Sequence, residues 1–426
     1  MPRAKHLSSF FAARFKGTAG MPFIMLATLI DMVAIGIIIP VLPALVGSFT
    51  ESQRDQAFWY GVVTFAFGFT NFFGSPILGT LSDAYGRRPV LLIGFCGLAL
   101  TFILTGLATS LAMLIVVRLV GGAMQANISV ANAYVADITP AASRAKRFGR
   151  LNAMLGAGFA LGPVMGGLLG AVNLHLPFFV AGGLAVLNVL YGYFVVPESL
   201  PPQRRRPFRW RAANPVAALR KLANLKGAGR LVAVLACCGL AQFMLYTCWV
   251  LYTTFKFGWG PLENGWSLAA VGVVSAITQG LLLQRILKLV SPQRLAVLGL
   301  VSSTLAYVLW GAATQGWMMY AIIFLNILGA TVTSAIQSII SGAADEKSQG
   351  TTLGALGGLN SLMAVLAPPI GATLLTLVSE LPKGDWRIGA PFYFCAVLQG
   401  AALVLAVGQF RRERARRGAA GGRNSK

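Results

Sequence analysis

The sequence predicts an all-α integral membrane protein with twelve transmembrane helices in two six-helix, pseudo-symmetric halves. Three observations support this fold class: the composition, the apolar segments and the placement of the basic residues. Of the 426 residues, 56% are hydrophobic and 11% are charged, whereas soluble chains average about 25% charged residues. Because one helix crosses a bilayer with about 20 apolar residues, the chain has room for about a dozen spans. A soluble enzyme, a disordered chain and a disulfide scaffold fit this composition poorly.

Twelve apolar segments, each long enough to cross a bilayer, follow one another along the chain. They lie near residues 22–46, 58–80, 90–109, 111–135, 148–171, 177–196, 231–256, 264–288, 295–314, 317–341, 350–379 and 387–410. The five cysteines fall within apolar runs, without CxxC pairs or histidine partners. They are therefore expected to be buried thiols, and the sequence indicates neither a metal site nor a cofactor.

The basic residues mark one side of the membrane. The formal net charge is +23, and thirty of the 35 lysines and arginines fall at the termini or in alternate connections. Lys and Arg concentrate in short cytoplasmic loops, so we expect both termini in the cytoplasm of a bacterial-type inner membrane. The charge thus indicates orientation and contact with anionic lipid rather than nucleic-acid binding.

A basic, proline-rich connection divides the chain. We expect a cytoplasmic N-terminal segment (1–21), a first six-helix bundle (22–196), a cytoplasmic basic linker (197–230), a second bundle (231–410) and a basic cytoplasmic tail (411–426). GRLNAMLGAGFALGPVMGGLLG in the first half aligns weakly with GALGGLNSLMAVLAPPIGATLL in the second. Two related six-helix halves are typical of secondary transporters, although Gly/Pro-rich spans also resemble one another by composition alone. The dipeptide Gly-Lys is absent, so a Walker A loop is not the energy source.

Two ionisable residues lie deep within predicted spans. Asp31 in the first segment is flanked by Ile30 and Met32. A carboxylate at such a depth costs about 2.5–3.5 kcal/mol on insertion scales and marks a functional site by default. Asp31 is thus the candidate proton-coupling group, and a structural acid is the alternative. Arg118 lies in the fourth segment on the other side of the midplane, so a direct pair with Asp31 is not assured.

Further polar residues suggest a gate and a pocket. Asp137 ends the fourth segment, where it supports a gate through Arg87, Arg88 or Arg144, or is a plain helix-end charge. At mid-depth, a few polar groups among aromatic rings match the make-up of a pocket for a mostly apolar ligand, although Asn and Gln also link helices in membranes. The candidates for this substrate cavity are Gln125, Gln242, Tyr246, Trp249, Gln279 and Asn326.

A loop motif and four helix segments carry a family resemblance. The connection after the second segment reads GTLSDAYGRRPV, with Gly79 for close helix approach, Gly86 in the turn, and Asp83, Arg87 and Arg88 as its charges. The other stretches are LIDMVAIGIIIPVLP, RLVGGAMQAN, GAGFALGPVMGG and CWVLYTTFKFGWG. Together they resemble the major facilitator superfamily and, within it, the tetracycline-efflux branch of drug:proton antiporters. The resemblance covers about residues 22–410.

The resemblance implies the major facilitator fold and roles for individual residues. Asp83 would interact with the cytoplasmic end of a second-half helix when the inner gate is shut, and Arg118 would take part in proton coupling. Gly158, Gly162, Pro163 and Gly166 would form the antiporter helix motif. The chain departs from the branch at Thr101 and Ser303, where acids are expected, and at Ser275, where some members have histidine, although Gln279 matches.

The function expected from these features is proton-coupled export of amphipathic small molecules or drugs by a monomeric antiporter. Its partners are the substrate, protons and the lipid bilayer. An importer or facilitator of a small nutrient on the same fold is the first alternative, since fold does not settle direction. A receptor or scaffold that transports nothing is the second, and the cost of burying Asp31 argues against it. No constellation of residues supports enzymatic catalysis.

Overall fold

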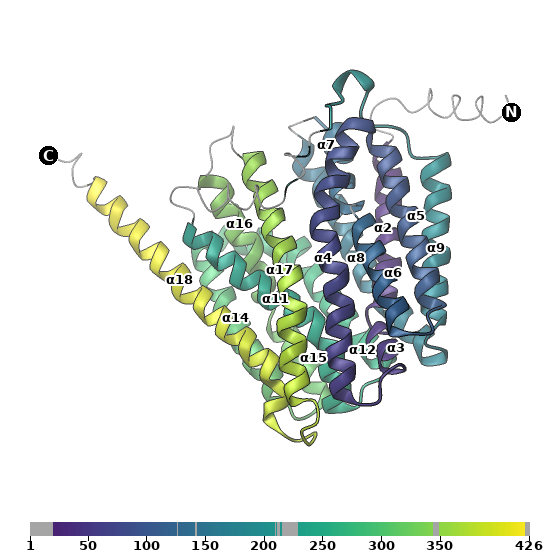
Figure 1. Ribbon diagram of the computed structural model, residues 1–426. Helices are drawn as coiled ribbons and strands as arrows, with labels where there is room; N and C mark the ends of the chain where they lie inside the picture. Colours follow the sequence, from purple (N-terminus) through teal and green to yellow (C-terminus); the bar gives the residue numbers. More distant parts are fainter. Residues whose placement is uncertain are drawn as a thin grey trace. The chain divides into compact units, whose positions relative to one another are not determined.

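The computed structural model describes residues 20–125, 127–140, 143–208, 210, 214, 229–343 and 349–421, and every regular element in them is a helix (Figure 1). In this described part, 11 helices are long and apolar enough to cross a membrane. The number is 12 when the pair Gly316–Leu325 and Gly329–Ile340, bent by 53°, is one span. The all-helical membrane fold predicted from the sequence is confirmed.

The helices pack as two compact units. Unit 1 takes in the chain up to Ser52, the stretch from Val62 to the central linker, and Trp259–Val273. Unit 2 takes in Gln53–Gly61, the stretch from the linker to Gly258, and the chain from Val274 onward. Two long helices, α4 and α12, therefore contribute residues to both units.

Unit 1 is built around α2, which packs on α8 and α9, while α5 packs on α9 (Figure 1). Its elements are α2 (Gly20–Ile38), α3 (Leu42–Gly47), α4 (Gln53–Tyr85), α5 (Arg87–Gly106), α6 (Leu111–Met124), α7 (Asn127–Asp137), α8 (Arg144–Val172), α9 (Leu176–Phe194), η2 (Pro202–Arg204) and most of α12 (Pro261–Ile277). The start of α12 joins this unit at a backbone contact with α8, since a Cβ at Gly265 would lie 3.0 Å from the Cα of Gly167.

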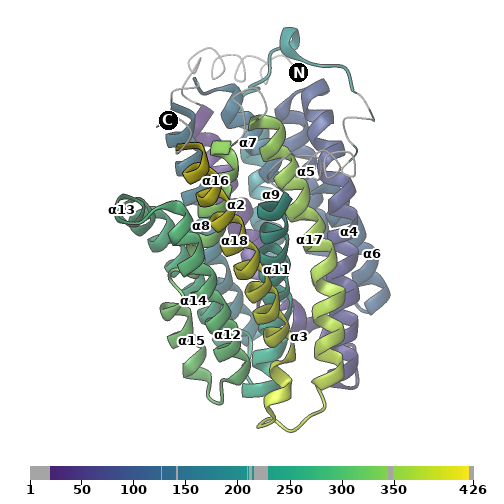
Figure 2. The same ribbon diagram turned by 90° about the vertical axis from the view of Figure 1, so that its left-hand side faces the viewer.

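Unit 2 is built around α11, which packs on α17 and α18, while α14 packs on α18 (Figure 2). Its elements are α11 (Gly229–Phe257), the π-helical segment η3 (Thr278–Leu282), α13 (Leu283–Leu289), α14 (Pro292–Ala312), α15 (Gly316–Leu325), η4 (Gly329–Thr331), α16 (Val332–Ala343), α17 (Gln349–Val378), η5 (Trp386–Gly389) and α18 (Ala390–Gly421). Its aromatic core joins Trp249, Trp310 and Phe392, with the rings of Trp249 and Trp310 5.4 Å apart.

Helix ends follow local sequence chemistry. The side-chain hydroxyl of Ser110 accepts a hydrogen bond from the backbone N–H of Met113 at 3.3 Å and caps α6. Ser291 caps α14 in the same way, and Pro292 is the first residue of that helix. A capping serine accepts a hydrogen bond from an N–H group that has no helical partner. Proline at the first position breaks no helical hydrogen bond, because the N–H that it lacks would have no helical partner there.

The fourth and tenth spans are interrupted, whereas the sequence predicts continuous segments. In the fourth span, α6 ends at Met124, Gln125 has an extended backbone, and α7 begins at Asn127. In the tenth span, α15 ends at Leu325, and a short 3₁₀ turn precedes α16. Each of the two units thus contains one broken span, and paired discontinuous helices in the two halves of a chain are a feature of transporter binding sites.

Candidate functional site

Asp31 lies at the break in the fourth span. Its side chain is 4% exposed, and its Oδ1 accepts a hydrogen bond from the side-chain amide of Asn127 at 2.9 Å. Asn127 is the first residue of α7 and is equally buried. The carboxylate therefore faces the N-terminal end of a half-helix, where the helix dipole favours negative charge.

A side chain of α4 contacts the backbone at this break. The side-chain amide of Asn71 donates to the backbone oxygen of Gln125 at 2.6 Å and lies 3.4 Å from that of Gly122. These carbonyl groups stand at the end of α6, where helical hydrogen bonding stops. Asn71 thus supplies the donor that the interrupted helix lacks.

The glycines of α8 bring it into backbone contact with the helix that carries Asp31. A Cβ at Gly158 would lie 2.7 Å from the Cβ of Met32, and one at Gly162 would lie 2.7 Å from the Cα of Gly36. Small residues four apart allow such close approach between membrane helices. The predicted antiporter helix motif, Gly158, Gly162, Pro163 and Gly166, therefore lies in α8 and, through these contacts, against α2.

Arg118 does not pair with Asp31. It lies in α6, with its guanidinium carbon 5.9 Å from the centre of the Phe67 ring. An arginine within about 6 Å of an aromatic face gains cation–π attraction. The structure therefore separates the two deep ionisable residues, and a part for Arg118 in proton coupling stays a prediction.

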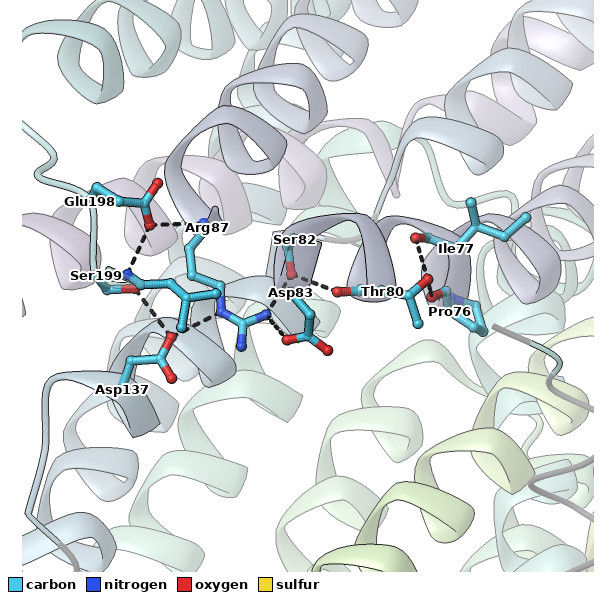
Figure 3. Close-up of polar contacts among 11 residues, drawn as sticks. Pro76, Ile77, Thr80, Ser82, Asp83, Arg87, Asp137, Glu198 and Ser199 are labelled. Carbon is cyan, nitrogen blue, oxygen red and sulfur yellow. Dashed lines mark hydrogen bonds and ion pairs between the residues drawn. The ribbon is translucent and has the colours of Figure 1, made fainter. Parts of the chain in front are cut away.

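Arg87 joins three side chains at the loop-motif end of unit 1 (Figure 3). Its guanidinium lies 2.6 Å from Asp83 Oδ1 and 2.9 Å from Asp137 Oδ2, and it donates to the hydroxyl of Ser82 at 2.6 Å. The Arg87 side chain is 10% exposed, against 44% for Asp83 and 22% for Asp137. The ion pair expected between Asp137 and Arg87 is present, and the network ties together α4, α5 and α7.

Glu198, at the start of the central linker, caps α5 beside this network (Figure 3). Its carboxylate accepts from the backbone N–H of Arg87 at 2.9 Å and of Arg88 at 3.3 Å. These are the first two residues of α5, whose N–H groups have no helical partner. Glu198 was not identified from the sequence, because an acidic residue in a polar connection is not unusual. The sequence feature that could have identified it is its position directly after the sixth apolar segment.

Other contacts fasten the linker to the same end of unit 1. The hydroxyl of Ser199 donates to Asp137 Oδ2 at 3.3 Å. The backbone N–H of Arg206 donates to the backbone oxygen of Asp83 at 3.0 Å. The first residues of the predicted linker are therefore part of the candidate gate rather than a spacer beside it.

The remaining loop-motif residues have separate roles. Gly86 has a φ of 111°, which favours glycine, and a side chain there would run into Glu198. The guanidinium of Arg88 donates to the backbone oxygen of Tyr193 and lies over the Tyr193 ring. At Gly79 a Cβ would meet no described atom within 4 Å, and a close helix approach at this glycine stays a prediction.

The cavity candidates fall into two groups. Gln242, Tyr246 and Gln279 are exposed, and Gln125 is half-buried at the break in the fourth span. Gln279 lies within the π-helical segment η3, a distortion frequent at functional sites.

The other two candidates, Trp249 and Asn326, make contacts within unit 2. Trp249 is 2% exposed, and its ring packs against Trp310 and Phe392 in the core of unit 2. At this burial Trp249 offers no surface to a substrate, since its ring is covered by other aromatic rings of unit 2. Asn326 ends α15 at the bend and accepts a hydrogen bond from the hydroxyl of Ser302 at 3.0 Å.

Thr101 and Ser303, the positions without the expected acids, are both buried. The Thr101 hydroxyl donates to the backbone oxygen of Gly97 at 2.8 Å, and a Cβ at Gly121 in α6 would lie 3.2 Å from the methyl group of Thr101. The Oγ atom of Ser303 lies next to the position that a Cβ would take at Gly329, which is part of the bent tenth span. Both small side chains therefore fit close packing against an interrupted helix.

The spanning helices, the bent tenth span and the carboxylate buried at the interruption between α6 and α7 are features of a multi-pass membrane transporter. The family model described as Major Facilitator Superfamily matches residues 24–288 and 231–425. The chain therefore belongs to the major facilitator superfamily and is a transporter, not an enzyme.

Curated relatives and solved structures agree with this family. The chain is 35% identical over 365 residues to the class C tetracycline resistance protein of Escherichia coli, covering 85% of this chain and 92% of the relative. It is 32% identical over 370 residues to the class D tetracycline resistance protein of Salmonella ordonez, covering 87% of this chain and 93% of the relative. The crystal structure of the human organic anion transporter MFSD10 is similar, with a TM-score of 0.70 and 23% identity. The match covers 91% of this chain and 98% of that transporter.

Proposed function

We propose that this transporter is a proton-coupled antiporter that exports amphipathic small molecules, drugs among them. The observation that carries the proposal is Asp31, a carboxylate buried in a spanning helix with an amide as its hydrogen-bond partner. A carboxylate that reaches the two sides of the membrane in turn loads a proton on one side and releases it on the other. The tetracycline resistance proteins among the relatives support drugs as the exported class.

In this proposal the Arg87 network with Asp83 and Asp137 belongs to the inner gate. Gln125 in unit 1 and Gln242, Tyr246, Gln279 and Asn326 in unit 2 are the polar groups that contact substrate. The protein works as a monomer in a bacterial inner membrane and binds no nucleic acid. The domain bounds predicted from the sequence belong to the same proposal, with 197–230 as the cytoplasmic linker.

Drug export is tested in a drug-sensitive bacterial strain. We expect expression to raise resistance to at least one amphipathic drug in a panel that includes tetracycline. We also expect that, in everted vesicles with an acidified interior, adding that drug releases protons. The matched control is the Asp31→Asn variant at equal expression. Growth on a carbon source that depends on the protein, without any change in resistance, would instead establish the importer alternative.

The proposed orientation is tested by reporter fusions. Fusions at both termini and within 197–230 are expected to report the cytoplasm, and fusions at Arg54 and Lys383 the periplasm, because lysine and arginine concentrate on the cytoplasmic side. A cytoplasmic signal from the Arg54 fusion contradicts the proposed arrangement of the first two spans.

A further inference from the structure

The amide of Asn127 has a fixed direction. Its nitrogen lies 2.9 Å from Asp31 Oδ1 and donates to it, an arrangement that suits an ionised carboxylate, which accepts hydrogen bonds and cannot donate them. Its other end lies against Gly94 of α5, where a Cβ would be 2.9 Å from the amide carbon of Asn127. A side chain at Gly94 would therefore push the amide out of this position.

Among the residues that the structure describes, no charged side chain forms an ion pair with Asp31. The helices packed on α2 are α7, α8 and α9, and their titratable and charged side chains are Tyr134, Asp137, Arg144, Lys146, Arg147, Arg150, Tyr191 and Tyr193. Asp137 lies ten residues beyond Asn127, which is about 15 Å along a helix. Arg150 lies eight residues before Gly158, the glycine that contacts Met32, or about 12 Å. Asn188 of α9 faces α2 but donates to the backbone oxygen of Ala27.

We propose that Asn127 is the positioning residue for proton exchange at Asp31, and that Gly94 supplies the space its amide needs. This inference rests on the proposed function, since it assigns how the coupling carboxylate releases its proton. A donor to the ionised carboxylate favours that form, and the N-terminal end of α7 acts in the same direction. Asn127 therefore stabilises the carboxylate that remains when the proton leaves.

The test compares Asn127→Leu, which keeps the approximate size and removes the donor, with Gly94→Ala, which displaces the amide without altering it. Both variants are expected to lose uphill transport at neutral pH and to keep substrate exchange without a proton gradient. Their transport profiles are expected to move toward alkaline pH by roughly one to two units, the effect of losing a hydrogen bond to a charged group. Gly183→Ala in α9 is the matched control, because a Cβ there meets nothing within 4 Å.

A second readout separates this inference from the proposed function. The infrared band of the protonated carboxyl group of Asp31, identified by its loss in Asp31→Asn, is titrated in wild type, Asn127→Leu and Gly94→Ala. We expect the band to persist to higher pH in both variants. An unchanged titration in Asn127→Leu overturns the positioning role whether or not any drug is transported. A wild type without proton-driven transport, but with the expected infrared shifts, overturns the proposed function alone.

Discussion

Replacing Asp31 with asparagine is expected to abolish uphill transport driven by a pH gradient while the protein still inserts and folds. Asparagine has nearly the same size and keeps a side-chain oxygen that accepts from Asn127, so the packing of α2, α7 and α8 is preserved. It cannot ionise, so no proton is carried between the two sides. In vesicles with an imposed pH gradient, substrate accumulation is expected to fall to that of protein-free vesicles, while exchange between equal concentrations continues.

The control for this prediction is Glu51→Gln. Glu51 is an exposed acid outside the spanning segments, so its substitution removes the same charge without touching the buried site. We expect it to transport as wild type does. Accumulation by Asp31→Asn equal to that of wild type rules out Asp31 as the coupling group, and Asp137 then becomes the next residue to test.

The sequence identifies Asp31 as a candidate site residue, but it does not identify Asn127, which donates a hydrogen bond to Asp31. A lone acid in an apolar run stands out because burying it is costly. Asn127 does not stand out, because asparagine links helices in many membrane proteins and its partner lies 96 residues away. The break between α6 and α7 is equally hidden, because the stretch GGAMQANISV contains no proline. It depends on Asn71 in another helix, a tertiary contact that no local pattern predicts.

Burial explains the other differences between sequence and structure. Trp249 and Tyr246 lie within one turn of each other in α11, yet Trp249 is buried and Tyr246 is 38% exposed. Twelve consecutive hydrophobic spans show little contrast between inward and outward faces, so helix periodicity does not separate core from cavity residues. The contacts of the loop motif, in contrast, can be predicted from the sequence, because its charged residues lie at the ends of the spans. Arg87 and Asp137 form an ion pair there.

Arg87→Gln is expected to destabilise the fold far more than Asp83→Asn. Arg87 is 10% exposed and pairs with two carboxylates, and removing one member of a buried ion pair costs about 3–5 kcal/mol. Asp83 is 44% exposed, and an exposed pair contributes about 0–1 kcal/mol. Without Asp83, Arg87 still contacts Asp137 and Ser82. The free energy of unfolding of the purified protein, measured by denaturant titration, checks both variants.

The same pair of variants separates folding from gating. Arg294→Gln is the matched control for Arg87→Gln, because Arg294 also lies in the first turn of a spanning helix but is exposed; it is expected to keep wild-type stability. For Asp83→Asn we expect near-wild-type stability with a loss of transport of up to about fivefold, since a charge at an exposed helix end contributes about 0.3–1 kcal/mol and about 1.4 kcal/mol corresponds to tenfold. Wild-type transport by Asp83→Asn would show that Asp83 has no part in the gate. In that case the motif acts by anchoring α4, α5, α7 and the Glu198 segment to one another through Arg87.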